Sequence, residues 1–274
     1  MSSVIGTIIL LFTGLATYKG FLDRQYFERH LFHTDPILID KQYDRLFSSG
    51  FLHANWMHFG FNMIALLSFS WSLEFVLGVP KYLLIYVGAL LGGNLLALYL
   101  HRNHPDYKAV GASGAISGVI FASVVLFPEV KISLILLPFE ISTWVFGLCF
   151  VVISIFGIKS QSDNIGHDAH LGGAIVGVLL TIIMKPSILQ TSWWLILLIL
   201  VPATVFLVLI VRNPAILLID NYWGEGLNVS RKSKPPRSNN KVSLDYLLDK
   251  INHQGIDSLT AKERELLDQY RKEM

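Results

Sequence analysis

The stretch GASGAISGVIFASVVLF at residues 111–127 joins a serine between glycines to an uninterrupted apolar run. The run is typical of a helix with no face toward water. Ser113 stands at its start, where helical N–H groups lack an intrahelical acceptor. The stretch therefore allows two interpretations. Gly114 and Gly118 form a GxxxG helix-packing pair, or Ser113 is a nucleophile beside amides that bind an oxyanion.

The composition places this stretch in a membrane protein. Of the 274 residues, 53% are hydrophobic and only 15% are charged, and the mean hydropathy is +0.52. Average soluble domains are about 25% charged. The net charge of +2 gives no reason to expect nucleic acid as a partner. The single cysteine, Cys149, lies in an apolar block, so no intramolecular disulfide is predicted.

Apolar blocks along the chain predict helices that cross the lipid bilayer, each of which needs about 20 residues. We place them at residues 4–17, 51–73, 81–100, 111–127, 141–157, 167–184 and 193–211. The predicted fold class is an all-α polytopic membrane protein. We divide it into a six-helix core at 1–186, an additional transmembrane helix at 187–211, a basic flexible linker at 212–241 and a short amphipathic helical tail at 242–274.

The tail is predicted to dock onto a partner that the sequence does not identify. Residues 228–241 are rich in lysine, arginine, serine, asparagine and proline, a composition typical of linkers. One apolar stripe is formed by Leu244, Leu247, Leu248 and Ile251. Thr260 and Glu263 have the spacing of a capping box. These segments are too short for an ordinary independent core.

Polar side chains interrupt the predicted helices at one end of the bundle. The second predicted helix contains His53, His58 and Asn62, and the last two share a face because they are four residues apart. His170 lies near the start of the sixth helix. Helices two, four and six begin on the same side, so the Ser113 hydroxyl and the His170 imidazole can meet there. Such groups either form interhelical hydrogen bonds or line a functional cavity.

Three motifs resemble those of the rhomboid intramembrane serine proteases. The Gly-x-Ser-Gly motif of that family matches residues 111–114, and its Ala-His-x-x-Gly-x-x-x-Gly motif matches residues 169–177. Its His-x4-His-x3-Asn motif matches His53, His58 and Asn62. The resemblance covers residues 4–186 and implies a six-helix rhomboid-like bundle, to which this chain adds a seventh helix.

The resemblance also implies a mechanism. Ser113 would be the nucleophile and His170 the general base and then acid, while Asn62 and His58 would stabilise the oxyanion with the Ser113 backbone N–H. Supporting roles fall to Gly111, Gly114, Gly173, Gly177 and His53. The implied protein is a serine endopeptidase without cofactor or metal, whose partners are the bilayer and transmembrane protein substrates. Its implied location is a bacterial inner (cell) membrane, with the active site open to the extracytoplasmic side.

Two positions depart from the family pattern. Ser117 stands where members of the family often have an aromatic residue packed on the catalytic imidazole, so that packing must come from elsewhere. In the first loop, Asp44-Arg45 occupies the place of the Trp-Arg of many family members, so only the arginine is retained. Asp168 precedes His170 by two residues, about 200° around a helix, so we do not expect it to orient His170.

Two other functions stay open. A catalytically inactive rhomboid-like protein would bind transmembrane helices without cutting them. A transporter or metal channel would use His53, His58, His167 and His170 as ligands, but it needs a polar lining through the membrane. A zinc protease is disfavoured because the sequence contains no His-Glu-x-x-His.

Overall fold

The computed structural model describes residues 3–133, 140–160, 165–213, 247, 250–251 and 258–273. It divides into two compact units, Met1–Asn221 and Tyr222–Met274. Within the described residues, five helices are long and apolar enough to cross a membrane: α1 (Val4–Leu22), α5 (Trp56–Leu77), α6 (Val79–Leu100), α9 (His167–Met184) and α11 (Trp193–Arg212). Two shorter apolar helices, α7 (Ser113–Leu126) and α8 (Thr143–Ser160), complete the bundle. The predicted all-α polytopic fold is confirmed.

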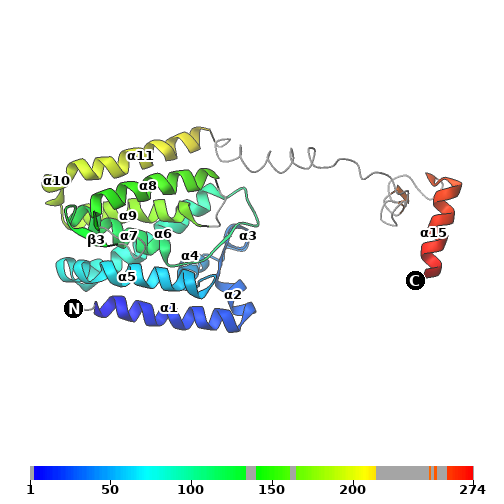
Figure 1. Ribbon diagram of the computed structural model, residues 1–274, viewed down its shortest axis with the longest axis horizontal. Coiled ribbons are helices and arrows are strands. Elements are labelled where there is room, and N and C mark those ends of the chain that lie inside the picture. The colour runs from blue at the N-terminus through cyan, green and yellow to red at the C-terminus, as the bar shows by residue number, and fades with distance from the viewer. Residues whose placement is uncertain are drawn as a thin grey trace. The chain divides into compact units, whose positions relative to one another are not determined.

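Helix α7 is the centre of the first unit. Helix α1 packs on α5, α5 on α7, and α7 on both α6 and α9, while α11 packs on α8 (Figure 1). Every residue of α7 from Gly114 to Val125 is buried, as its apolar sequence requires. With 14 residues, α7 is about 21 Å long, whereas the hydrocarbon core of a bilayer is about 30 Å thick. Helix α7 therefore does not span the full thickness.

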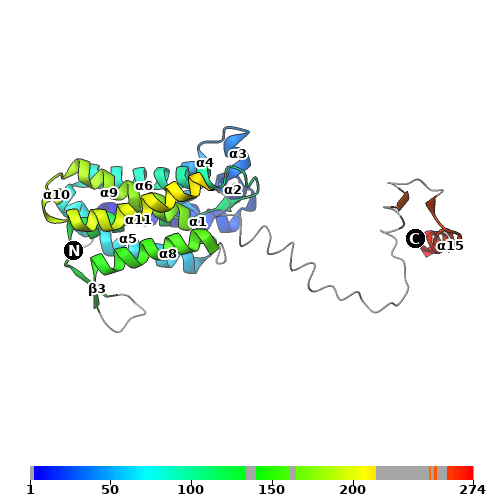
Figure 2. The same cartoon turned by 90° about the horizontal axis from the view of Figure 1, so that it is seen from above.

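Helices α5, α7 and α9 begin at one end of the bundle, which we call the serine end. The short helices α2 (Arg24–His30), α3 (Thr34–Leu38) and α4 (Arg45–Ser48) gather there as well (Figures 1 and 2). The chain's N-terminus and α10 (Ile188–Thr191) lie at the opposite end. Helix α11 starts near α10 and ends at the serine end.

The start of α5 differs from the sequence prediction. Residues 51–55 were predicted to be helical, but Ser49–Phe51 form a short 3₁₀ helix, η1, and α5 begins only at Trp56. The reason is Asn55, whose extended backbone and side-chain oxygen cap the helix by accepting the N–H of His58 at 2.8 Å. His53 therefore precedes the helix instead of lying on it.

Two short strand pairs were not predicted. Strand β1 (Phe32–His33) pairs antiparallel with β2 (Lys108–Ala109) at the serine end, with Phe32 opposite Ala109. Strand β3 (Lys131–Ser133) pairs antiparallel with β4 (Glu140–Ser142), with Ile132 opposite Ile141. Strands of two or three residues are too short to show the alternation by which a sequence reveals them.

The second unit contains the predicted capping box. Helix α15 (Ala261–Glu273) begins after Thr260, whose N–H donates to the Glu263 carboxylate at 2.8 Å. The Glu263 N–H donates back to the Thr260 hydroxyl at 3.4 Å. The Lys250 ammonium bonds the same carboxylate at 2.9 Å, and Lys250 and Thr260 together lower the pKa of Glu263 to about 2. Leu247 and Leu259 are buried, and Ile251 of the predicted stripe is half-buried. Leu244, Leu248 and residues 214–241 of the predicted linker lie outside the described residues, while Arg212, predicted to begin the linker, is the last residue of α11.

Candidate active site

Ser113 is the first residue of α7, as its position in the sequence predicts. The residue before it, Ala112, provides no side-chain cap. The N–H groups of the first turn therefore lack both an intrahelical acceptor and a capping side chain. The Ser113 side chain is half-buried. It combines a hydroxyl with a helix start that favours negative charge.

Gly111 places the His58 ring beside the serine. Its φ of 136° is a conformation that side chains other than glycine rarely adopt. A Cβ atom at this position would lie 2.9 Å from Cε1 and Nε2 of His58 and 3.6 Å from Oγ of Ser113. The imidazole and the hydroxyl are thus close neighbours around one glycine. The Gly111 N–H also donates to the carbonyl of Ser49 at 3.0 Å, which fixes the approach to α7.

His53 fixes the residue between Gly111 and Ser113. Its Nε2 accepts the N–H of Ala112 at 3.5 Å, and its Nδ1 lies 2.9 Å from the hydroxyl of Thr17. That hydroxyl donates to the carbonyl of Phe51 at 3.0 Å, so it accepts from His53, which fixes the tautomer with the proton on Nδ1. Complete burial, and then the nearby His58, lower the pKa of His53 to about 3. His53 is therefore neutral, and it connects α1 to the serine.

Asn62 presents an unsatisfied donor. It lies one turn after His58 on α5 and is 8% exposed. Its Nδ2 is buried and finds no acceptor among the described residues. A buried donor without an acceptor costs about 1–3 kcal/mol. An oxyanion held beside Ser113 would satisfy it.

The helix containing His170 touches the helix containing Ser113 through glycines. A Cβ atom at Gly114 would lie 3.3 Å from the carbonyl oxygen of Ala169, and one at Gly173 would overlap the carbonyl of Gly114. Gly177 makes the same kind of contact with Gly118 one turn further. Ser113 directly precedes the first contact and His170 directly follows it. These glycines can therefore serve close helix packing, and this packing does not exclude a catalytic role for Ser113 and His170.

An aromatic residue on another helix contacts His170. Ser117 donates its hydroxyl back to the carbonyl of Ser113 at 2.7 Å, and it has no ring to stack on the imidazole. The ring of Phe150, on α8, lies 5.7 Å from the His170 ring at 41°. This is the separation of an ordinary aromatic contact. The sequence analysis did not identify Phe150, because no spacing along one helix indicates which residue of another helix will face it.

The two polar residues before His170, His167 and Asp168, are both buried and have different contacts. His167 lies one turn before His170 in α9. Its side chain is buried against the backbone of Gly157, and its ring lies 5.7 Å from that of His170 at 77°. The Asp168 carboxylate contacts His101 at 3.0 Å, in keeping with the expectation that it does not orient His170.

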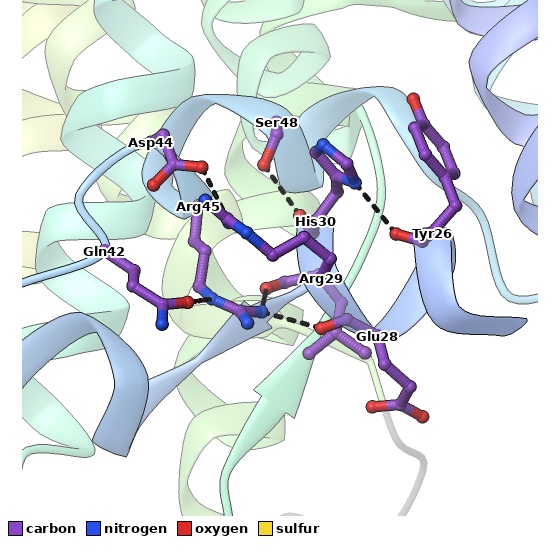
Figure 3. Close-up of polar contacts among 9 residues, drawn as sticks. Tyr26, Glu28, Arg29, His30, Gln42, Asp44, Arg45 and Ser48 are labelled. Carbon is purple, nitrogen blue, oxygen red and sulfur yellow. Dashed lines mark hydrogen bonds and ion pairs between the residues drawn. The ribbon is translucent and has the colours of Figure 1, made fainter. Parts of the chain in front are cut away.

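Arg45 organises the first loop, between α1 and α5. Its guanidinium is 6% exposed and donates to Oε1 of Gln42 at 2.7 Å and to the carbonyls of Glu28 and Leu31 at 2.8 Å each (Figure 3). Asp44, in the place of the usual tryptophan, binds Arg29 at 2.8 Å, and this bond lowers the pKa of Asp44. The arginine thus holds together the loop that presents Ser49 to Gly111.

The histidines that the structure describes do not meet in a group that could hold a metal ion. In the part of the chain that the structure describes, no three His, Cys, Asp or Glu side chains converge on one point. Ser113, His58, Asn62 and His170 instead place a hydroxyl, two imidazoles and an amide at one end of the bundle.

Comparison with known proteins gives two family matches. The family model described as the rhomboid domain matches residues 40–187. A second model, described as a family of unknown function, matches residues 229–273.

Individual relatives are similar over the first of these regions. "Rhomboid protein 1, mitochondrial" of Saccharomyces cerevisiae is 35% identical over 137 residues, which are 49% of this chain and 40% of that protein. "Putative rhomboid protease YdcA" of Bacillus subtilis is 34% identical over 139 residues, 50% of this chain and 65% of that protein. "Presenilin-associated rhomboid-like protein, mitochondrial" of Homo sapiens is 31% identical over 132 residues, 47% and 35% of the two lengths. The matches thus cover less than two thirds of each relative.

Proposed function

Because the chain belongs to the rhomboid family, we propose that it is an intramembrane serine endopeptidase that cleaves peptide bonds in or near transmembrane segments of other membrane proteins. The observation that supports this most directly is the glycine contact between α7 and α9. It is flanked by Ser113 on one helix and His170 on the other.

In the proposed reaction, Ser113 and His170 exchange one proton. The Ser113 Oγ attacks the carbonyl carbon of the scissile bond while His170 accepts the hydroxyl proton. His170 then gives this proton to the leaving amine, and the peptide bond breaks to form an acyl-enzyme. Water repeats the steps with the same base, which releases the carboxylate and restores the serine.

The proposed oxyanion site has three donors. They are the N–H of Ser113, the amide of Asn62 and the imidazole of His58. The unsatisfied Nδ2 of Asn62 supports this assignment, because the negatively charged oxygen would supply its missing acceptor. Loss of one such donor typically lowers kcat by about 10²–10³-fold. We expect Asn62→Ala to fall in this range.

The short central helix supports a site within the membrane. If the inner end of α7 is level with those of its neighbours, its serine lies about 9 Å below the opposite surface. Water and substrate would have to enter this recess. A helical substrate has its backbone groups hydrogen-bonded, so it must unwind locally before the carbonyl can reach Ser113.

The proposed location is the cell membrane of a bacterium, with the serine end at the extracytoplasmic side. Family resemblance supports this orientation, and the multi-pass fold agrees with it. The substrates of this protein would then be transmembrane proteins whose scissile segment lies in the outer half of the bilayer.

The function is tested with the full-length protein in liposomes that also contain a model transmembrane substrate. We expect the wild type to cut the substrate and to be labelled at Ser113 by a fluorophosphonate. In that reaction the serine oxygen bonds to phosphorus and displaces fluoride, which leaves with the serine proton. Ser113→Ala and His170→Ala should abolish both signals. The matched control is Ser123→Ala, which removes a buried hydroxyl at the other end of the same helix and should leave cleavage unchanged.

Two results would overturn the proposal. Cleavage that persists in Ser113→Ala would exclude the serine as nucleophile. A wild-type protein that binds transmembrane segments but neither cuts any of them nor reacts with the fluorophosphonate would favour the inactive, helix-binding alternative.

A further inference from the structure

A buried carboxylate joins the loop before Ser113 to the helix of His170. Asp168, in the first turn of α9, is 3% exposed and receives three kinds of donor. His101, at the end of α6, contacts it through Nε2 at 3.0 Å, and the Tyr107 hydroxyl donates at 3.2 and 3.3 Å. The N–H of Ala169 donates at 2.9 Å.

The geometry of this cluster is well defined. The His101 and Tyr107 rings are stacked, 3.6 Å apart and 4° from parallel. An ionised carboxylate only accepts hydrogen bonds, so His101 has its proton on Nε2. The other nitrogen of His101 lies 3.0 Å from Nδ1 of His104. Burial and the Asp168 charge raise the pKa of Tyr107, which keeps its phenol protonated as a donor.

The cluster acts on both catalytic elements. Tyr107 belongs to the loop that leads to Gly111 and Ser113, and its carbonyl accepts the N–H of Thr34 in the first loop at 3.2 Å. Asp168 is two residues from His170, on a helix that has no side-chain cap. We propose that Asp168, with His101 and Tyr107, is a positioning group that sets the Ser113 loop against the His170 helix. This inference rests on the proposed proteolytic function.

The Asp168 cluster would act by fixing the position of the Ser113 loop relative to α9, and it would not itself contact the substrate. If the carboxylate is lost, the loop and the helix remain packed but are no longer held in one register. A misplacement of about 1 Å between reacting groups lowers the rate by about 10²-fold. The proposal therefore predicts a loss in kcat with little change in KM, because the substrate contacts are made elsewhere.

The test uses Asp168→Asn, Asp168→Glu and Tyr107→Phe in the full-length protein. We expect Asp168→Asn to lower kcat by about tenfold to a hundredfold and Tyr107→Phe by less, with KM within about twofold of wild type. Asp168→Glu keeps the charge and should recover part of the loss. The matched control is Tyr82→Phe. It removes a fully buried phenol that is bonded to Ser70 at 2.7 Å, near the start of α6 and away from the serine end.

Thermal unfolding separates positioning from stability. The inference is supported if Tyr107→Phe and Tyr82→Phe lower Tm similarly and only Tyr107→Phe lowers kcat. It is overturned if both lose kcat in proportion to Tm, or if Asp168→Asn keeps full kcat.

Hydrogen exchange provides a readout that does not depend on proteolysis. Asp168→Asn should speed exchange in residues 105–112 and in the first turn of α9, and Tyr82→Phe should not. Unchanged exchange in Asp168→Asn would overturn the inference. If the wild type shows neither cleavage nor serine labelling, the proposed function fails instead, and the exchange result reports on the contact alone.

Discussion

At Gly111, backbone conformation and space both exclude a side chain. The φ of 136° costs about 1–3 kcal/mol for other residues, and a Cβ atom would lie 2.9 Å from the His58 ring. We expect Gly111→Ala to lower kcat by at least about 10²-fold, because it displaces an oxyanion donor and the serine together. Cleavage assays and thermal unfolding would measure both effects.

Gly60 provides the control for that substitution. It lies inside α5, and a Cβ atom there would have no neighbour within 4 Å. Gly60→Ala should keep full activity and raise stability by about 1 kcal/mol, because alanine favours the helix. If Gly111→Ala and Gly60→Ala lowered kcat equally, the effect of Gly111→Ala would not come from its contacts with His58 and Ser113.

His53 makes the stability of the protein depend on pH. The folded state keeps the imidazole neutral to a pKa of about 3, whereas an unfolded chain binds the proton below its ordinary value of 6.5. Stability is therefore complete above pH 6.5 and falls as the pH is lowered toward 3. Through His53 alone, the free energy of unfolding at pH 5 is about 2 kcal/mol lower than at neutral pH.

The measurement is thermal unfolding in detergent between pH 7.5 and 4.5, for wild type and His53→Gln. The variant should start with a lower Tm and show a shallower decline with acidity. An identical decline in the two proteins would contradict the role given to His53.

At the scale of the elements, Phe150 of α8 provides the aromatic contact with His170 that Ser117 of α7 cannot make. Phe150→Ala should lower kcat by about two- to tenfold, since an aromatic contact contributes about 0.5–1.5 kcal/mol to holding the imidazole. Phe156→Ala is the control on the same helix, because that side chain is 67% exposed and faces away from the bundle. Loss of activity in both variants would indicate a general weakening of α8.

The elements also show what the sequence can predict. Apolar blocks and the three motifs were sufficient for the membrane helices and for the ends at which Ser113 and His170 lie, because these signals are local. The start of α5 was misplaced, since the cap at Asn55 competes with an apolar run that continues before it. Phe150 and the contacts of Asp168 could not be predicted. They depend on which faces of separate helices meet, and no spacing in one segment records that.

At the scale of the whole molecule, the path of the chain predicts the side of the tail. Helix α11 ends at Arg212 at the serine end, so the chain leaves this helix on the side where Ser113 lies. The linker is basic, however, and basic segments favour the cytoplasm. The two considerations conflict if the serine end is extracytoplasmic.

Single cysteines would decide between them. In a Cys149→Ser background, Asp40→Cys marks the serine end, Gln190→Cys the opposite end and Gln269→Cys the tail. A membrane-impermeant maleimide added to intact cells should label positions 40 and 269 and spare 190. Labelling at 40 without 269 would show that α11 does not cross the membrane.

The unsatisfied amide of Asn62 has a consequence for how this protein can evolve. If the protein is the proposed protease, its resting state keeps a buried donor without an acceptor and is less stable for it, while the donor is ready for the oxyanion. A leucine of similar volume would remove that penalty, so Asn62→Leu should raise the melting temperature while abolishing cleavage. A lineage selected only for robustness would drift toward such a replacement and end as a stable protein that no longer cuts. Under the proposed function, Asn62 lowers the stability of the fold and its amide is useful only for proteolysis.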